Sequence, residues 1–318
     1  MAQQKVLITG GSGTVGQAFY KYYDGDFEFY NVSRNESYIQ VLRRNFPEVQ
    51  SFVADIQDLD HLSNILLKVK PDIVIHSAGV KHVNFAELNP SKTVEINIIG
   101  SLNVAKACIR AEVPIVVGIS TDKACQPENI YGYSKKILEQ MFLEHYNIQT
   151  KFVCTRFANV AFSNGSVIPF WIESALRGES LQLTDSRMTR LMFTKEDAVG
   201  LIWQSIDYAA KSTKPFILCS RMKSVSMLDL ANHVSQEFGL GQKPEIVGLR
   251  PGERLSETLV SQHELSHAWH TDIGDNIMLY SDEFGASPVK EPLSSLSAEY
   301  MTEDELRSLY ITEVAPFE

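Results

Sequence analysis

The sequence predicts a doubly wound α/β fold, in which helices cover both faces of a mostly parallel sheet. Apolar runs with the length and continuity of strands buried on both faces recur through the first half of the chain. They lie at residues 5–9, 28–32, 49–53, 72–76, 115–119 and 151–155. Amphipathic stretches such as 58–68 and 90–111 separate these runs and are long enough to be crossover helices. Strand and helix therefore alternate as a parallel sheet requires.

Two of these helices carry sequence signals for their first residues. Asp58 directly precedes a periodic apolar run, where a capping carboxylate is favoured. Asn89 and Pro90 provide a cap followed by proline at the first helical position.

The second half of the chain shows a looser alternation. A turn-rich segment at 163–166 leads into an apolar helix, and a helix at 195–208, a strand at 216–219 and a helix at 227–238 follow. A chain of 318 residues exceeds a typical single domain. We expect one unit over residues 1–160 and a smaller α/β lobe over residues 161–318 that is interleaved with the sheet.

Composition excludes several classes of protein. A net charge of −10 without any cluster of Lys and Arg argues against nonspecific nucleic-acid binding. No apolar run approaches the roughly 20 residues that span a bilayer, and the first residues lack a signal-peptide pattern. The four cysteines, Cys108, Cys125, Cys154 and Cys219, are far apart and suggest neither disulfides nor a metal site. We expect a cytoplasmic protein that does not bind membranes.

A glycine-rich turn directly follows the first predicted strand. It comprises Gly10, Gly11, Ser12, Gly13, Thr14, Val15 and Gly16 and leads into a helical pattern at 17–23. Such a turn lets the backbone approach a pyrophosphate, which then faces the helix N-terminus. Any tight strand-to-helix turn could use these glycines, but here strand and helix flank them as a dinucleotide site requires. Residues 1–160 are therefore predicted to be a Rossmann domain that binds a dinucleotide.

The end of the second predicted strand indicates which dinucleotide binds. NAD-binding folds usually place a carboxylate there for the ribose 2′-hydroxyl, but this strand ends in Ser33 and Arg34. A hydroxyl and a guanidinium suit a 2′-phosphate, which predicts NADP. Arg34 could also be an ordinary loop residue. Asp55, after the third strand, could accept a hydrogen bond from the adenine amino group or cap the next helix.

Residues 120–135 contain the candidate reactive groups. Tyr131 and Lys135 are spaced by one helical turn, so the ammonium can lower the pKa of the phenol and make it a usable base. Asp122 and Lys123 lie just beyond a predicted strand. The Tyr-Lys spacing alone could arise by chance on a surface helix, and Asp122 could simply cap the next segment. The glycine turn upstream favours a redox site.

Several motifs appear in the order found in one enzyme family. They are Ser-Thr-Asp-Lys-Ala at 120–124, Tyr-Gly-Tyr-Ser-Lys at 131–135, Asn159-Val160 followed by Gly-Ser-Val-Ile-Pro at 165–169, Met-Thr-Arg at 188–190, and Arg-Pro-Gly-Glu at 250–253. In these residues the chain resembles the inverting UDP-N-acetylglucosamine 4,6-dehydratases, which are extended short-chain dehydrogenases/reductases. The resemblance runs from about residue 5 to residue 310. Its specific part is Thr-Asp-Lys, because relatives that epimerise or only oxidise sugars usually differ there.

The resemblance implies a role for each reactive group. Tyr131, assisted by Lys135, would take the proton of the sugar 4-hydroxyl as hydride leaves C4, and Thr121 would bond the 4-oxygen. Lys123, partly neutral through burial and cationic neighbours, would take the C5 proton, and a protonated Asp122 would release the 6-hydroxyl as water. Coupling between the two pKa values leaves this division open.

The resemblance also implies the binding residues. Those for NADP are Gly10, Ser12, Gly13, Thr14, Val15, Gly16, Ser33, Arg34, Asp55, Ile56, Ala78, Lys81, Tyr131 and Lys135. Those for the UDP-sugar are Lys81, Asn159, Val167, Arg187, Arg190, Arg250 and Glu253, with the arginines near the diphosphate and Glu253 near the uridine ribose. Each arginine could instead belong to a surface ion pair. Asn164 replaces a frequent Arg, and Val80 and Asn84 also depart from the family, which bears on the identity of the sugar.

The sequence thus predicts an NADP-dependent UDP-N-acetylglucosamine 4,6-dehydratase, and such enzymes are often homo-oligomers. A UDP-sugar 4-epimerase is the alternative, because it uses the same Tyr-Lys pair and cofactor. A regulatory protein that binds the dinucleotide without turnover is a third possibility, against which the Asp-Lys pair argues.

Overall fold

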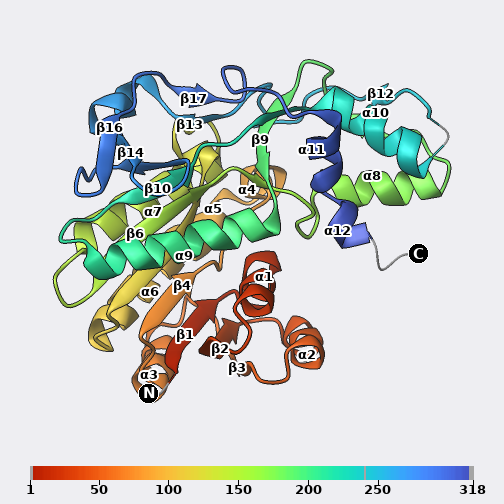
Figure 1. Cartoon of the computed structure of the whole chain (residues 1–318). Coiled ribbons are helices and arrows are strands. Elements are labelled where there is room, and N and C mark those ends of the chain that lie inside the picture. Colours follow the sequence, from red (N-terminus) through yellow and green to blue (C-terminus); the bar gives the residue numbers. More distant parts are fainter. Residues whose placement is uncertain (1–2, 240, 315–318) are drawn as a thin grey trace.

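The computed structural model describes residues 3–239 and 241–314, and a single large sheet runs through it (Figure 1). Among the described residues this sheet has ten strands, in the order β16-β14-β15-β10-β6-β5-β4-β1-β2-β3. The parallel strands are β1 (Gln4–Thr9), β2 (Phe27–Ser33), β3 (Gln50–Val53), β4 (Ile73–His76), β5 (Ile115–Thr121), β6 (Lys151–Phe157) and β10 (Ile217–Ser220). The predicted doubly wound α/β class is confirmed.

Three antiparallel strands extend the sheet beyond β10 and were not predicted. They are β15 (Asn276–Leu279), β14 (Ala268–Thr271) and β16 (Gly285–Pro288). The chain after residue 160 thus returns to the sheet that the first half begins. The boundary at residue 160 stays a prediction.

Helices cover both faces of the sheet because alternate strand residues point to opposite sides. Leu7, Val74 and Val116 pack in one core with α3 (Leu59–Val69), α6 (Gly100–Arg110) and α7 (Ile130–His145). Val6 and Ile75 pack in the other core with α1 (Thr14–Tyr22), α2 (Glu36–Asn45) and α9 (Lys195–Lys211). Figure 1 shows α9 lying across the front of the sheet.

The predicted helix at 90–111 is continuous but not uniform. It consists of α5 (Pro90–Thr93), a π-helical segment (Val94–Ile99) and α6. Asn89 makes no side-chain capping bond, whereas the expected cap at Asp58 is confirmed, because its carboxylate accepts from the N–H of His61.

The smaller lobe has its own core around Trp171, Leu230 and Tyr310 and lies at the upper right of Figure 1. Its helices are α8 (Val167–Leu176), α10 (Met227–Phe238), α11 (Glu303–Ser308) and α12 (Ile311–Val314). Its strands form small sheets: β7 (Asn159–Val160) with β9 (Thr189–Phe193) and β11 (Ser224–Ser226), and β8 (Gln182–Leu183) with β12 (Glu245–Ile246). A further pair, β13 (Thr258–Val260) with β17 (Leu293–Ser294), packs instead in the core that contains Leu7.

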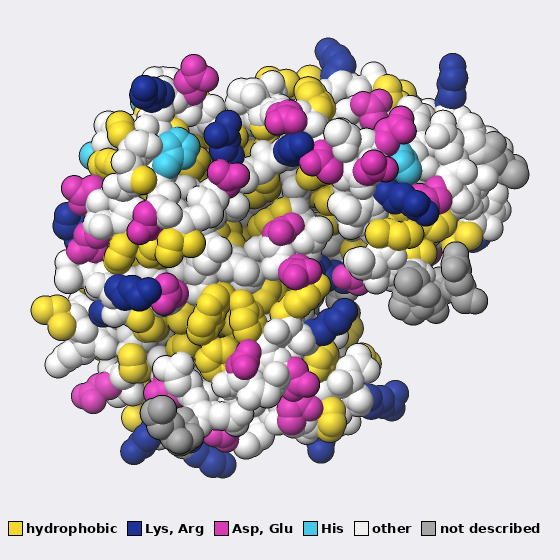
Figure 2. Space-filling model, in the orientation of Figure 1, with side chains coloured by type: hydrophobic (Ala, Val, Ile, Leu, Met, Phe, Trp, Pro, Cys, Tyr) yellow, Lys and Arg dark blue, Asp and Glu magenta, His cyan; other side chains and the backbone are white. Residues whose placement is uncertain are grey.

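Two further features bear on the partners of the protein: its surface charge and the composition of its helices. Figure 2 shows Lys and Arg dispersed among Asp and Glu on this face, with no basic patch. None of the helices in the described ranges is long and apolar enough to cross a bilayer.

Candidate active site

The reactive residues meet at the carboxyl end of β5, which is where ligands bind in doubly wound folds. β5 ends at Thr121, and a 3₁₀ turn (Asp122–Ala124) carries the next two candidates. The side chain of Asn129 then caps α7 by accepting from the N–H of Gly132, so that α7 presents Tyr131 and Lys135 in its first turns. The structure therefore brings all five predicted reactive residues to one place.

The glycine turn has the close backbone packing of a dinucleotide cradle. Gly10 has a φ of +71°, and a Cβ there would lie 2.8 Å from the Cα of Ala78. A Cβ on Gly16 would lie 2.4 Å from the Cα of Gly11, so only glycine lets α1 approach the turn. Thr14 and Val15 begin α1, whose N-terminus closes the cradle beside Gly13. The turn fits a pyrophosphate group.

Hydroxyls and a guanidinium gather where the adenosine ribose would lie. The Ser12 hydroxyl donates to the Ser33 hydroxyl over 3.0 Å, and Ser33 donates to Asn31 Oδ1. Arg34 is 60% exposed, and its Nη1 lies 3.9 Å from Asp55 Oδ2. Asp55 accepts from the N–H of Gln57, while Ile56 is buried beside it. β2 ends in Ser33, so its last residue carries a hydroxyl in place of a carboxylate.

Tyr131 and Lys135 are both buried, but their electrostatics differ from the expectation. Burial raises the pKa of Tyr131, which the charge of Lys123 and a hydrogen bond with Thr121 partly offset. Lys135 Nζ donates to the carbonyl of Ile119 over 2.8 Å, and burial lowers its pKa to about 8. The cation that lowers the pKa of the phenol is therefore Lys123 rather than Lys135.

Lys123 is held between two carboxylates, which corrects the expected partly neutral amine. Its Nζ lies 3.1 Å from Asp122 Oδ1 and 3.3 Å from Glu257 Oε1. Burial would lower the pKa of Lys123, but the charges of Asp122 and Glu257 outweigh it and raise the pKa. The expected cationic neighbour is present in Arg190, yet its effect is smaller than that of the carboxylates. Lys123 is thus charged at rest.

Asp122 accepts several hydrogen bonds on a single oxygen. Its Oδ1 receives the Thr121 hydroxyl at 2.9 Å, the Lys123 N–H at 2.9 Å and Lys123 Nζ at 3.1 Å. Its Oδ2 is buried and has no hydrogen-bond partner among the described residues. Asp122 therefore has one carboxylate oxygen held by hydrogen bonds and a second, buried oxygen whose hydrogen-bonding capacity is unused.

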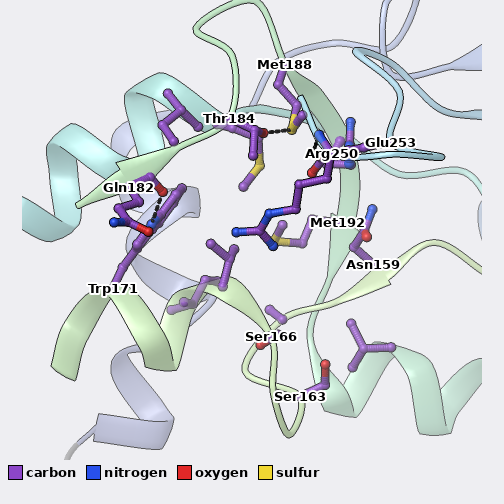
Figure 3. Close-up of a pocket in the computed structure, with 17 residues that line it drawn as sticks. Asn159, Ser163, Ser166, Trp171, Gln182, Thr184, Met188, Met192, Arg250 and Glu253 are labelled. Atoms are coloured by element: carbon purple, nitrogen blue, oxygen red, sulfur yellow. Dashed lines mark hydrogen bonds between the residues drawn. The ribbon is translucent and has the colours of Figure 1, made fainter. Parts of the chain in front are cut away.

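A pocket of about 270 Å³ opens in the smaller lobe next to this site (Figure 3). Predicted substrate residues that line it are Asn159, Val167, Arg190, Arg250 and Glu253. In Figure 3 the Arg250 side chain extends into the middle of the hollow, opposite the N-terminal turn of α8. Arg190 instead donates to the carbonyls of Thr189, Arg254 and Leu255.

Two predicted substrate residues lie outside the lining of this pocket. Arg187 is 72% exposed and pairs with Asp185. Lys81 Nζ donates to the carbonyl of Asn164 over 2.6 Å, and the N–H of Asn164 donates to the Thr14 hydroxyl over 3.0 Å. The loop at 163–166 therefore contacts the glycine turn and the segment after β4 together, and it also contributes to the pocket wall.

Comparison with known proteins identifies the family. Residues 6–278 match the family described as polysaccharide biosynthesis protein. The chain belongs to this family. The expected resemblance is confirmed by a relative from Campylobacter jejuni named UDP-N-acetylglucosamine 4,6-dehydratase (inverting), which is 33% identical over 82% of this chain and 79% of its own. A protein from Rickettsia canadensis named UDP-glucose 4-epimerase is 29% identical over 85% and 81%. The solved structure of Pen from Bacillus thuringiensis covers 98% of both chains with a TM-score of 0.88 and 28% identity.

In this polysaccharide biosynthesis protein, sequence reasoning missed several residues of the site. Glu257 touches Lys123, and Trp171, Gln182 and Thr184 line the pocket. Trp171 lies on the apolar helix α8, where its apolar neighbours gave no sign of a pocket, and Gln182 and Thr184 lie on or next to the two-residue strand β8. Glu257 lies five positions after Gly252 of the Arg-Pro-Gly motif, and its closeness to this motif was the only signal in the sequence. Nothing in the sequence indicated that its carboxylate is buried.

Proposed function

We propose that this protein is an NADP-dependent UDP-N-acetylglucosamine 4,6-dehydratase that inverts C5. The observation that carries the proposal is the group formed by the buried Thr121 and Asp122 and the largely buried Lys123 beside Tyr131, next to a pocket in the smaller lobe. Elimination needs an acid and a base in addition to the redox pair, and an epimerase does not. The relative named inverting dehydratase supports the same assignment.

In this proposal each residue acts on a stated atom of the sugar. Tyr131 accepts the proton of the 4-hydroxyl, and Thr121 bonds the oxygen that becomes a ketone. The ketone acidifies the C5 proton, which Lys123 removes, and Asp122 delivers a proton to the departing 6-hydroxyl. Because Asp122 and Lys123 are 3.1 Å apart, proton exchange between them is direct.

Bound NADP would take up hydride from C4 and return it to C6. Gly10, Gly13 and Gly16 would hold its pyrophosphate, and Lys135 its nicotinamide ribose. Contacts of loop 163–166 with Thr14 and Lys81 cross the cradle and support tight retention of the cofactor. Arg250 and the α8 N-terminus would bind the diphosphate of the substrate, with Glu253 near its uridine ribose. Arg187 would assist only by turning away from Asp185.

The preference for NADP over NAD follows from Ser33 and Arg34. An exposed guanidinium beside two hydroxyls favours a 2′-phosphate, and a charge-assisted contact of this kind contributes about 1.5–3 kcal/mol. Titration should therefore give a dissociation constant at least about tenfold lower for NADP than for NAD. The variant Arg34→Ser should remove most of this difference. Equal constants in the wild-type protein would contradict the prediction.

Product analysis tests the reaction. Purified protein is incubated with UDP-N-acetylglucosamine in deuterated water, and the product is examined by mass spectrometry and NMR. Loss of one water with deuterium at an inverted C5 supports the proposal. An unchanged mass with altered C4 stereochemistry indicates the epimerase, and an unchanged sugar indicates a protein that only binds.

A homo-oligomer is supported by an apolar face on two packed helical segments. Tyr133 and Ile137 of α7 are 53% and 41% exposed, and Val94 and Ile99 of the adjoining π-helical segment are 42% and 46% exposed. Burying such a face against a second copy is favourable. Light scattering should show more than one copy per particle for the wild type and a smaller particle for Tyr133→Asp. A monomeric wild type would refute this expectation.

A further inference from the structure

Glu257 is a buried carboxylate next to the reactive lysine, and none of the roles above uses it. It is 3% exposed and directly precedes β13. Its Oε1 lies 3.3 Å from Lys123 Nζ, while Oε2 is buried without a hydrogen-bond partner among the described residues. A buried carboxylate oxygen without a partner costs stability, so its presence calls for a reason other than packing.

The backbone around Glu257 holds its carboxylate in place. The N–H of Glu257 donates to the Ser295 hydroxyl over 3.0 Å, and the N–H of Ser295 donates to the Glu257 carbonyl over 2.9 Å. Arg190 donates to the carbonyls of Arg254 and Leu255 just before it. Segments of the second half of the chain thus deliver a fixed carboxylate to a lysine of the first half.

The charges around Glu257 and Lys123 affect how readily each group holds a proton. Asp122 and Arg190 act on both groups, and Tyr131 acts on Lys123. Burial and the charge of Asp122 raise the pKa of Glu257, and the charges of Lys123 and Arg190 only partly offset this. An ammonium cannot remove a proton from carbon, so Lys123 must first lose one. Glu257 is the contacting group that holds a proton more readily than an ordinary glutamate.

Building on the dehydration proposed above, we propose that Glu257 is a positioning residue that takes up the ammonium proton of Lys123 and so frees the amine to act at C5. One N–H bond of Lys123 breaks, its electron pair stays on Nζ, and the proton forms an O–H bond at Oε1. Ammonium and carboxylate become amine and carboxylic acid, so net charge is unchanged and no further reactant is needed.

The steps up to the loss of water also balance. Nζ takes the C5 proton, and the C–H electron pair passes into the enolate of the 4-ketone. The new ammonium passes a proton through Asp122 Oδ1, 3.1 Å away, to the 6-hydroxyl. The C6–O pair leaves with water as the enolate pair forms the C5–C6 double bond. Glu257 then returns its proton to Lys123.

Substitution of Glu257 tests this inference. In Glu257→Gln, turnover with UDP-N-acetylglucosamine should fall about 100-fold or more, KM should stay within a few-fold, and deuterium exchange at C5 should fall with turnover. Glu257→Asp, which keeps a carboxylate, should recover part of the turnover. The matched control is Glu128→Gln. This variant removes an exposed carboxylate that pairs with Arg254, three residues before Glu257, and it should remain near wild-type activity.

A second measurement follows how the Lys123 amine loses its proton. In Glu257→Gln the ammonium proton can no longer pass to the contacting carboxylate and must leave to solvent, so turnover should rise more steeply with pH above neutrality than in the wild type. Equal pH profiles for the two proteins, or Glu257→Gln turnover and C5 exchange at wild-type rates, overturn the inference while the proposed function stands. A wild-type protein that leaves the sugar intact overturns the proposed function and this step together.

Discussion

At the scale of single residues, the site depends on the charge of one amine. To act as a base, Lys123 needs a neutral nitrogen, but its two carboxylate contacts favour the ammonium form. Its charge also lowers the pKa of Tyr131, so the protonation of Lys123 affects the chemistry of both residues. Deprotonation of Lys123 therefore makes Tyr131 a weaker acid and helps it keep the proton of the 4-hydroxyl.

Two substitutions of Lys123 separate its base function from its charge. Lys123→Ala should lower water loss about 100-fold or more and leave the NADP dissociation constant within a few-fold of wild type. Lys123→Arg keeps the charge but cannot release a proton near neutral pH, so it should be equally inactive. Wild-type turnover in either variant, measured by mass spectrometry of the product, would refute Lys123 as the base.

At the scale of elements, glycine has opposite consequences in two helices. In α1, a Cβ on Gly16 would meet the backbone of Gly11 at 2.4 Å, whereas in α9 a Cβ on Gly200 would meet no atom within 4 Å. Helix propensity favours alanine at both positions. Steric overlap decides the outcome at Gly16, and propensity decides it at Gly200.

Alanine scanning of these two positions should therefore give opposite signs. Gly200→Ala should raise the free energy of unfolding by about 0.5–1 kcal/mol. Gly16→Ala should lower it by about 1–3 kcal/mol and weaken NADP binding, because the turn must move. Urea unfolding and cofactor titration measure both effects. A Gly16→Ala protein that binds NADP as wild type does would show that the cradle tolerates a side chain.

Elements with a local pattern could be predicted from the sequence, and contacts between distant segments could not. The strands, the glycine turn and the Thr121 to Lys135 constellation each carry a short-range signal. The antiparallel strands β14 to β16 are short, and they join the sheet through the pairing of β15 with β10. Hydrogen bonds to Ser295 and from Arg190 to the preceding residues hold Glu257 at the site, and no sequence periodicity links these residues to Lys123. Asp122, adjacent in the sequence, also raises the pKa of Lys123, but the second carboxylate could not be foreseen.

At the scale of the whole molecule, a buried ionic network joins the two halves of the chain. Arg156 on β6 is fully buried and bonds Glu139 on α7, Glu264 in a 3₁₀ turn (Gln262–His267) and the carbonyl of Leu259 on β13. The sulfhydryl of Cys125 also donates to Glu264. Removing one partner would leave a buried charge uncompensated, which typically costs about 3–5 kcal/mol.

This network predicts how stability depends on pH. Burial would raise the pKa of Glu264, but Arg156 and further hydrogen bonds hold it at about 2, below the ordinary value of 4.5. A lowered pKa stabilises the fold above pH 4.5 and loses that contribution as the pH falls toward 2, which amounts to about 3 kcal/mol. Urea unfolding across this range should show the loss. Glu264→Gln should be less stable near neutrality and lose less on acidification; equal pH slopes for both proteins would contradict the assignment.

The return of the chain to its first sheet also has a consequence for synthesis. When residue 160 leaves the ribosome, β6 is still an open edge and Arg156 still lacks Glu264. β10, which pairs with β6, emerges only after α8, β8, β9 and α9, and the carboxylate arrives after a further stretch of chain. The first half of the chain, which carries the glycine turn, therefore completes its sheet and the ion pairs of Arg156 only when the second half has been synthesised. During that interval the nascent chain exposes the unpaired edge of β6, and an exposed strand edge is prone to pair with other chains.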